Sequence, residues 1–324
     1  MKVSVIVPVF GVERYIERCA RSLFCQTMPP TDVEYIFVND CTADSSIEIL
    51  QRIISEFPER NVTIVNHEKN LGLPSARKTG ISIAKGEYVL NCDSDDWVHP
   101  DYCQRLYDAA QSSNSDIVIC GYSISDGKNF WNNNWYDDSL LQKKPESIRC
   151  IISLQSSPYV WNKLIRRSLF STSDIVYPTC FLAEDWAFSV QLIVLADKVI
   201  YIPDILYYYF DNPLSFQKVS SKERCIKQMA DEEGNVQLVI NWLRAKKLKK
   251  PFHSELVKRM SITKSKIFPV TSDGNCRKLW RNTFREANFP ILFNRYIDFH
   301  YKKKHLALLL GIYAPVKHIY HLFK

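Results

Sequence analysis

Three aspartates, Asp93, Asp95 and Asp96, lie within four residues in the stretch "NCDSDDW" at 91–97. Carboxylates this close repel one another, and a hard divalent cation such as Mg²⁺ or Mn²⁺ offsets the repulsion because it prefers oxygen ligands. Asp93 and Asp95 share one face if the backbone stays extended, since side chains alternate along a strand. A polar turn in which one aspartate caps the next helix is the simpler alternative. Three carboxylates together favour a metal site that substrate phosphates complete.

A second acidic pair, Glu184 and Asp185, lies in "FLAEDWAF" at 181–188, at the start of a predicted helix. A carboxylate can take a proton from a substrate hydroxyl when burial or a neighbouring carboxylate raises its pKa. Acidic residues also favour helix N-termini for electrostatic reasons. On the residues alone these two explanations have equal weight.

Further polar residues follow the ends of predicted strands. They are Asn39 and Asp40, His67 to Asn70, and Asp93 to Asp96. In an open parallel sheet ligands bind at the carboxyl ends of the strands, so we expect one shared pocket there. The glycine-rich phosphate loops are absent from the sequence, and an EF-hand is excluded because Val98 and Gln104 stand where Gly and Glu are required.

The elements that position these residues alternate between strand and helix patterns over the first hundred residues. Strand patterns cover 3–10, 33–40, 62–67 and 87–93, and helix patterns cover 12–26, 45–57, 73–86 and the segment after Pro100. This alternation predicts an α/β fold, a Rossmann-like and mostly parallel sheet with helices on both faces. Further on, the sequence predicts a hairpin at Asp126-Gly127, a helix over 182–196 and short strands at 199–203 and 205–210.

Charge divides the chain into two parts. Residues 1–210 hold 19 Lys and Arg against 26 Asp and Glu, a net charge of −7, whereas residues 211–324 hold 23 against 9, a net charge of +14. We therefore expect a catalytic domain over 1–215 and a basic, mainly helical region over 216–324 that contacts an acceptor or a membrane surface.

Several observations bear on the location of the protein. No run of 18 or more apolar residues is present, so no membrane-spanning helix is expected, and the N-terminus is interpreted as a strand rather than a signal peptide. Ten cysteines without a C-x-x-C pair indicate free thiols in a reducing cytoplasm. Zinc binding by cysteine and nucleic-acid binding are not expected, since no motif supports either.

Three stretches resemble motifs of the family 2 glycosyltransferases. "VSVIVPVF" (3–10) resembles the family's opening strand, and "VNDCTADSS" (38–46) resembles V-D-D-G-S-x-D-x-S. "NLGLPSARKTGISIAKGEYVLNCDSDD" (70–96) resembles the N-x-G-x-x-x-A-R-x-x-G-x-x-x-A-x-G-x-Y pattern followed by D-x-D-D. The resemblance covers 3–97 and resumes at 161–188. It implies the glycosyltransferase A-type fold and inverting transfer from a nucleotide-sugar donor.

The resemblance also implies roles for single residues. Those expected to bind the nucleotide-sugar are Pro8, Val9, Phe10, Asp40, Asn70, Arg77, Asp93 and Ser94. Asp40 is expected at the base, typically uracil, Arg77 near the phosphates and Asp93 near the ribose, while Asp95 is expected to hold Mn²⁺ or Mg²⁺. Two positions depart from the family pattern. Asn39 replaces an Asp and loses its charge, and Cys41 replaces a Gly and loses freedom at positive φ.

The "FLAEDWAF" stretch resembles the family's E-D pair, which implies that Asp185 is the general base and that Glu184 holds Asp185 or the acceptor in place. Asp185 then takes the acceptor proton as the hydroxyl oxygen attacks the anomeric carbon, and a metal on Asp95 neutralises the leaving diphosphate. One displacement inverts the stereochemistry. No Q-x-x-R-W motif is present, so single additions are expected rather than processive synthesis.

"VWNKLIRRSLF" (160–170) resembles the family segment before the E-D pair. Trp161 offers a flat apolar face for a sugar, and Asn162 and Lys163 offer donors, so we expect these three to bind the acceptor, a glycan or lipid-linked glycan of cell-surface polysaccharide synthesis. Ordinary core packing is an equally weighted explanation for the tryptophan.

Two other functions remain open on the sequence. A nucleotidyltransferase would share the nucleotide fold and the carboxylates, but it expects a glycine-rich basic loop after the first strand, and "PVFGVER" is not such a loop. A catalytically silent nucleotide-sugar-binding or membrane-associated scaffold protein is the alternative from a different class. Asp95 and Asp185 argue against it.

The last forty residues, 285–324, mix aromatic, aliphatic and basic side chains. The apolar stretch "HLALLLGIYAPV" at 305–316 is too short to cross a bilayer but suits its interface, and Lys302 to Lys304 favour anionic headgroups. One interpretation is therefore a peripheral contact on the inner face of the cell membrane. The other, of equal weight, is a helical subdomain with a solvated basic face.

Overall fold

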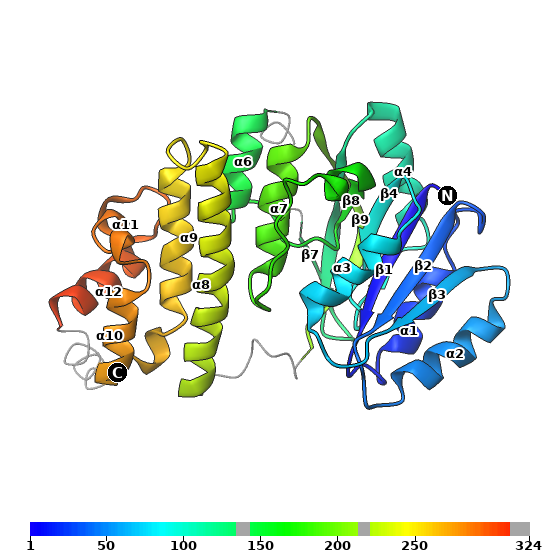
Figure 1. Cartoon of the computed structure of the whole chain (residues 1–324), viewed down its shortest axis with the longest axis horizontal. Helices are drawn as coiled ribbons and strands as arrows, with labels where there is room; N and C mark the ends of the chain where they lie inside the picture. The colour runs from blue at the N-terminus through cyan, green and yellow to red at the C-terminus, as the bar shows by residue number, and fades with distance from the viewer. Residues whose placement is uncertain (134–142, 213–220, 312–324) are drawn as a thin grey trace.

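The computed structural model describes residues 1–133, 143–212 and 221–311. Strands and helices alternate over its first two hundred residues (Figure 1). Their bounds are β1 (Val3–Val9), α1 (Ile16–Phe24), β2 (Val33–Asn39), α2 (Ser46–Glu56), β3 (Asn61–Asn66), α3 (Leu73–Ile83), β4 (Tyr88–Asn91), β5 (Trp97–Val98), α4 (Tyr102–Ser113), β6 (Ile117–Ser125), β7 (Phe130–Asn133), α6 (Lys144–Ile152), β8 (Lys163–Arg166), η1 (Arg167–Ser171), α7 (Glu184–Leu195) and β9 (Val199–Phe210).

The strands form one nine-stranded sheet in the order β3-β2-β1-β4-β8-β6-β9-β5, with β7 paired to β6. The first four strands are parallel, as the strand–helix alternation predicts. From β8 onward antiparallel pairs alternate with the parallel pair β6–β9. The α/β class is confirmed, and the parallel part is the half in which the sequence alternates regularly.

Side-chain alternation along β1 divides the core between the two faces of the sheet. Val3, Val5, Val7 and Val9 pack with residues of α1, α2 and α4 on one face. Ile6 packs on the other face, with residues of α3 and α7. Because both faces are covered, β1 is a nearly continuous apolar run in the sequence, interrupted by the buried Ser4.

The two short strands expected at 199–203 and 205–210 form a single strand, β9. Its pairing with β6 shifts register around Gly121, where an added Cβ would lie 2.8 Å from the side chain of Ile205. The shift absorbs Pro203, which would otherwise interrupt the ladder. The end of β9 thereby reaches the loop that follows β4. The predicted hairpin is also present, as the antiparallel pair β6–β7.

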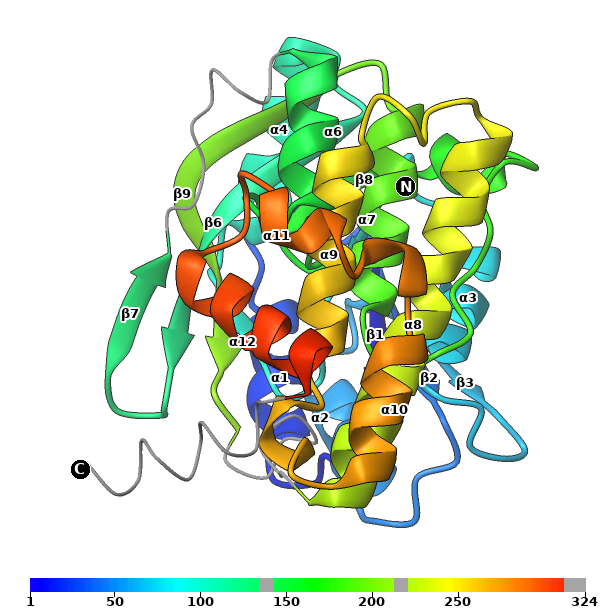
Figure 2. The same cartoon turned by 90° about the vertical axis from the view of Figure 1, so that its left-hand side faces the viewer.

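The basic region is helical in its described residues and forms the other end of the molecule (Figures 1 and 2). Its helices are α8 (Lys222–Ala245), α9 (His253–Ser265), η3 (Phe268–Val270), α10 (Gly274–Asn282), η4 (Arg285–Ala287), α11 (Pro290–Phe293) and α12 (Phe299–Leu310). α8 and α9 share one apolar core with α6 and α7. The expected boundary at 215/216 and residues 312–324 of the expected membrane-contacting tail lie outside the described residues. No helix in the described ranges is long and apolar enough to cross a membrane.

Candidate active site

The loop after β4 is held at the sheet edge by its most buried aspartate, Asp96. The Asp96 carboxylate accepts hydrogen bonds from the Tyr207 hydroxyl at 2.6 Å and from the Phe210 backbone N–H at 2.7 Å, both in β9. The Asp93 N–H donates to the same tyrosine oxygen at 3.0 Å. Asp96 therefore caps no helix; it ties the loop to β9. Burial raises its pKa well above the usual range, and the charges of Asp95 and Asp93 add to the effect.

Asp95 is partly exposed, and its carboxylate has a weak contact, a 3.3 Å hydrogen bond from the Asn212 amide. Arg18 donates to the Asp95 backbone oxygen at 2.7 Å, not to the carboxylate. Burial raises the pKa of Asp95. Arg18 is therefore near Asp95 but forms no hydrogen bond with its carboxylate among the described residues. A hard oxygen ligand of this kind fits Mg²⁺ or Mn²⁺ with phosphates completing the shell. No group of three or more His, Cys, Asp or Glu suited to a protein-only metal site occurs in the described ranges.

Arg77 in α3 connects the two acidic motifs. Its guanidinium donates to Asp93 Oδ1 at 2.7 Å and also contacts the carboxylates of Glu184 and Asp185. Only 1% of the Arg77 side chain is exposed. The sequence placed these residues in three separate motifs; the structure brings them together in one cluster, which we call the arginine cluster: Arg77, Asp93, Glu184 and Asp185.

The electrostatics of the arginine cluster favour added positive charge. Burial alone would lower the pKa of Arg77, but Asp185 and Asp93 raise it, so the guanidinium stays charged. Burial raises the pKa of Asp93, with Asp185 and Asp95 adding to the effect and Arg77 opposing it. One guanidinium among three carboxylates leaves an excess of negative charge, which a divalent cation close by would reduce.

Glu184 and Asp185 begin α7 directly after Ala183, which has the left-handed φ of 61°. This sharp turn points the acidic pair at the sheet edge, and an L-residue there carries strain. The preceding loop is held by Asn235 of α8, whose amide donates to the backbone oxygens of Cys180 and Leu182, both at 2.8 Å. A residue of the basic region thus fixes the segment that carries the expected general base.

Asp40, which is expected to bind the nucleobase, follows β2 and is buried. Its carboxylate accepts from His67 Nδ1 and from the backbone N–H groups of Leu71 and Gly72, each at 2.8 Å. Nearby, Cys41 has a φ of 59°, the positive value for which glycine is favoured. Asn39 accepts from the Thr42 N–H at 2.9 Å and supports the same turn.

The other expected nucleotide-sugar residues line the same edge to different degrees. Pro8 and Val9 are buried at the end of β1, and the Asp40 N–H donates to the Val9 oxygen at 3.0 Å. Phe10 is 54% exposed and offers a ring face beside them. Asn70 is exposed and accepts a hydrogen bond from the Gly72 N–H at 3.1 Å. Ser94 is buried in the loop after β4 that carries the three aspartates, which we call the aspartate loop.

The three residues expected to bind the acceptor are buried. Trp161 stacks between the rings of Tyr159 and Tyr207, with centroid separations of 4.7 and 4.3 Å. The Asn162 amide donates to the Cys120 oxygen, and Lys163 donates to the Ser157 and Tyr159 oxygens and to Asn162. Core packing, the alternative for Trp161, describes all three positions in this structure. The amide of Asn162 and the ammonium of Lys163 are engaged with protein oxygens rather than open to a ligand.

Sequence reasoning missed the residues that support the site from outside its motifs. Tyr207, Arg18 and Asn235 belong to no stretch that resembles the family. The run "ILYYYF" at 205–210 held the only signal for Tyr207, because a buried tyrosine hydroxyl needs a partner.

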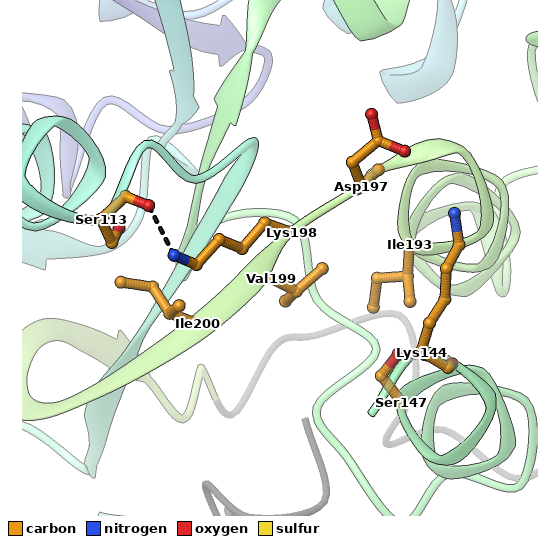
Figure 3. A pocket seen from close by; sticks show the side chains of 9 residues that line it. Ser113, Lys144, Ser147, Ile193, Asp197, Lys198, Val199 and Ile200 are labelled. Atoms are coloured by element: carbon orange, nitrogen blue, oxygen red, sulfur yellow. Dashed lines mark hydrogen bonds between the residues drawn. The ribbon is translucent and has the colours of Figure 1, made fainter. Parts of the chain in front are cut away.

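A cavity of about 480 Å³ lies at the opposite end of β9, between α6, α7 and the strand (Figure 3). Lys198 crosses one side of it and donates from Nζ to the Ser113 backbone oxygen at 2.6 Å. The cavity adjoins Val199 at the start of β9, whereas the aspartate loop contacts Phe210 at its end. It is therefore separate from the candidate active site.

Comparisons with known proteins give the sequence family and the fold. Residues 4–187 match the sequence model of the family described as glycosyl transferase family 2. The uncharacterized glycosyltransferase EpsJ of Bacillus subtilis is 35% identical over 226 residues, 68% of this chain and 64% of that protein. The poly(ribitol-phosphate) beta-glucosyltransferase of Bacillus spizizenii is 34% identical over 211 residues, 64% of this chain and 32% of that protein. The matched segments span less than two thirds of these relatives' own lengths.

Solved structures give the fold. The crystal structure of S. aureus TarS 1–349 has a TM-score of 0.73 at 19% identity and covers 100% of this chain and 92% of its own. The same fragment in complex with UDP-GlcNAc has a TM-score of 0.62 at 19% identity, covering 100% and 93%. The mannosyltransferase PcManGT from Pyrobaculum calidifontis, in complex with GDP-Man and Mn²⁺, has a TM-score of 0.56 at 15% identity, covering 99% and 87%. At these identities the likeness establishes a shared fold.

Proposed function

Because this chain belongs to the family 2 glycosyltransferases, we propose that it transfers a sugar from a nucleotide-sugar, a UDP-sugar in the first instance, to a hydroxyl of a glycan or lipid-linked glycan. Transfer inverts the anomeric carbon and depends on Mg²⁺ or Mn²⁺. The product belongs to cell-surface polysaccharide synthesis.

The arginine cluster is the observation that carries this proposal. Arg77 contacts Asp93 of the expected donor site and Asp185, the expected base, at once. The residue expected to bind the sugar donor and the residue expected to deprotonate the acceptor are therefore neighbours at one edge of the sheet. A general base has to lie beside the hydroxyl that attacks the donor sugar, so this neighbourhood is what a direct displacement requires.

In the proposed mechanism Asp185 takes the acceptor proton while Glu184 and Arg77 hold its carboxylate in place. Burial of Arg77 and its contacts with Asp93 fix the distance between the donor side and the base. Asp95 would hold the divalent cation, which supplies positive charge to the leaving diphosphate. The expected contact between Arg77 and the phosphates stays a prediction, since the side chain is engaged with the three carboxylates.

The choice of a UDP-sugar draws on the structural neighbours and on the nucleoside side of the site. TarS 1–349, with the higher TM-scores, is described in complex with UDP-GlcNAc and with UDP. The single carboxylate of Asp40 and the exposed ring of Phe10 suit a pyrimidine base. The acceptor class draws on relatives whose names give poly(ribitol-phosphate), a phosphate-containing polymer, as the substrate of a glucosyltransferase and of an N-acetylglucosaminyltransferase.

A cytoplasmic location with peripheral contact at the inner face of the membrane is part of the proposal. Three large apolar side chains of the tip formed by α11 and α12 are strongly exposed: Phe293 at 85%, Phe299 at 68% and Leu310 at 63%. Phe299 and Leu310 lie on the same face of α12 as Lys303, whose ammonium lies 4.5 Å from the Phe299 ring centre. Aromatic and basic side chains on one helix face suit an anionic lipid interface.

Vesicle pelleting tests this contact. We expect the full chain to sediment with vesicles that contain anionic lipid, and a Phe293→Ser, Phe299→Ser, Leu310→Ser variant to remain in the supernatant. Val176→Ser, an exposed apolar residue away from the tip, is the control and should pellet as the wild type does. Equal pelleting of the tip variant and the control would remove the membrane contact from the proposal.

A donor panel tests the function itself. The full chain is incubated with UDP-, GDP-, CDP- and dTDP-sugars and Mn²⁺, and released nucleoside diphosphate is measured. We expect release from UDP-sugars that rises with a glycan acceptor, falls on chelation of the metal and is lost in Asp95→Asn. Nucleotide binding without release from any donor would instead indicate a silent nucleotide-sugar-binding protein.

A further inference from the structure

The hydrogen bonds of Asp40 leave its two carboxylate oxygens in different states. Oδ1 accepts from both His67 Nδ1 and the Leu71 N–H, which uses the two lone pairs of that oxygen. Oδ2 accepts from the Gly72 N–H, so it keeps the capacity for one further donor. The remaining hydrogen-bonding capacity of Asp40 thus lies on Oδ2.

His67 is fixed from its other side by Thr79. The His67 Nε2 atom lies 2.9 Å from the Thr79 hydroxyl in α3, and Nδ1 lies 2.8 Å from Asp40. A carboxylate can only accept, so Nδ1 carries the proton, and a neutral ring then accepts at Nε2 from the Thr79 hydroxyl. Asp40 therefore fixes the proton on Nδ1, and the Thr79 hydroxyl, which can donate or accept, holds the ring in the orientation that donates to Asp40. This chain of contacts joins the ends of β2 and β3 to α3.

We propose that His67, held by Thr79, is a positioning residue that saturates Asp40 Oδ1 and leaves Oδ2 for one N–H of the nucleobase. This inference rests on the proposed function and specifies its donor. Uracil presents one imide N–H between two carbonyls, which matches a single acceptor. Guanine presents N1–H and an amino group side by side, which match a carboxylate with both oxygens open. Saturating Oδ1 removes that second acceptor, so UDP is selected over GDP.

Two substitutions at His67 separate the contact with Asp40 from the contact with Thr79. His67→Asn places an amide N–H where Nδ1 lies and keeps the donor to Asp40. His67→Gln places its amide where Nε2 lies, so it keeps the contact with Thr79 and loses the hydrogen bond to Asp40. Thr79→Val removes the hydroxyl at constant shape. Thr63→Val, an exposed threonine in β3, is the matched control.

Binding of UDP and GDP with Mg²⁺ is measured by titration calorimetry on the full chain, beside thermal unfolding. We expect the wild type and Thr63→Val to prefer UDP, and His67→Asn to stay within about threefold of them, because the donor to Asp40 remains. His67→Gln should bind UDP about tenfold more weakly while its GDP affinity holds or rises, which lowers the UDP/GDP ratio. Thr79→Val should lower the ratio in the same direction.

The outcomes distinguish this inference from the function on which it rests. If the wild type binds UDP and the ratio is unchanged in folded His67→Gln and Thr79→Val proteins, the positioning role is wrong and the proposed function stands. If His67→Gln fails to fold, the isosteric Thr79→Val protein decides in the same way. A wild type that binds neither nucleotide contradicts both. A merely structural role would lower the unfolding temperature and leave the ratio unmoved.

Discussion

Arg77 shows how much of this site depends on single side chains. It is a buried cation that contacts three carboxylates from two motifs more than ninety residues apart in the chain. Removing one partner of a buried ion pair leaves uncompensated charge, which costs more than the pair contributes. The contacts of Arg77 therefore bear on stability as well as on chemistry.

We expect Arg77→Met to lower the free energy of unfolding by about 3–5 kcal/mol, because Asp93, Glu184 and Asp185 would then face one another without a cation. Arg77→Lys should lose less stability but keep little transfer, since one ammonium cannot span three carboxylates. Urea denaturation measures both. Arg105→Lys, at an exposed ion pair with Asp204, is the control and should change stability by less than about 1 kcal/mol. A similar loss of unfolding free energy in Arg77→Met and in the control would contradict the interpretation that Arg77 compensates the three carboxylates.

His305 provides a pH test at the same scale. It is fully buried in α12, neither ring nitrogen has a hydrogen-bond partner in the described part of the chain, and burial, with the charge of Lys264, lowers its pKa to about 3. Between that value and its ordinary 6.5 the unfolded chain binds more protons than the folded one. Stability from this residue is thus present above pH 6.5 and is lost as the pH falls toward 3.

The expected slope is up to about 1.4 kcal/mol per pH unit in that window. His305→Phe should remove this part of the acid sensitivity and raise stability at pH 5, because it also removes two unpaired polar atoms. The measurement is urea unfolding at pH 5 and pH 7.5 for both proteins. If stability falls by the same amount between the two pH values in the wild type and in the variant, the assigned role of this histidine in acid sensitivity is contradicted.

Helices and strands could be predicted from the sequence where a single hydrophobic periodicity dominates a segment. The predicted strand–helix alternation is confirmed through α4, apart from the short strand β5, because the predicted strands are mostly apolar and each helix has one apolar face. The single strand β9 could not be predicted, since Pro203 suggests a break and only the bulge opposite Gly121 accommodates it. The burial of Asn162 and Lys163 was also hidden, because polar residues give no sign of tertiary partners. Residue types placed the arginine cluster's members in three motifs, whereas their contacts through Arg77 needed the fold.

α3 carries Arg77 and Thr79 and packs closely on β1 at Gly80. A Cβ at Gly80 would lie 2.3 Å from Ile6 Cγ2, closer than packed atoms allow. We expect Gly80→Ala to destabilise by about 1–3 kcal/mol even though alanine favours helix, and to reduce transfer because α3 must move.

Gly274→Ala in α10 is the control for that substitution. Its nearest neighbour would be the flexible end of Arg277 at 3.7 Å, so the change should be neutral or stabilising by up to about 1 kcal/mol. Thermal unfolding and nucleoside diphosphate release report the two effects. Gly80→Ala with wild-type stability and activity would show that α3 has room to adjust.

At the scale of the whole molecule, the basic helical region is packed into the catalytic unit. Its helices α8 and α9 share a core with α6 and α7, and Asn235 of α8 holds the loop before the acidic pair. The division of charge along the sequence suggested an appendage. The packing instead makes the helical region a support for the expected base, and its exposed tip lies at the far end of the long axis (Figure 1).

Asn235→Asp tests this support, because it keeps the shape and replaces two donors by acceptors that face the Cys180 and Leu182 oxygens. We expect kcat to fall at least about tenfold with the UDP affinity unchanged, since the donor side does not depend on this loop. Asn241→Asp, exposed on the same helix, should leave kcat unchanged. A fall in UDP affinity equal to the fall in kcat would instead point to general unfolding.

Asp185→Asn tests whether Asp185 is the base of an inverting glycosyl transfer. Asparagine keeps the size and an oxygen for Arg77 but cannot take a proton. We expect kcat to fall about 10²–10⁴-fold, with UDP binding by calorimetry within about threefold of the wild type. Turnover within about tenfold of the wild type, with UDP bound normally, would contradict the assignment of Asp185 as the base.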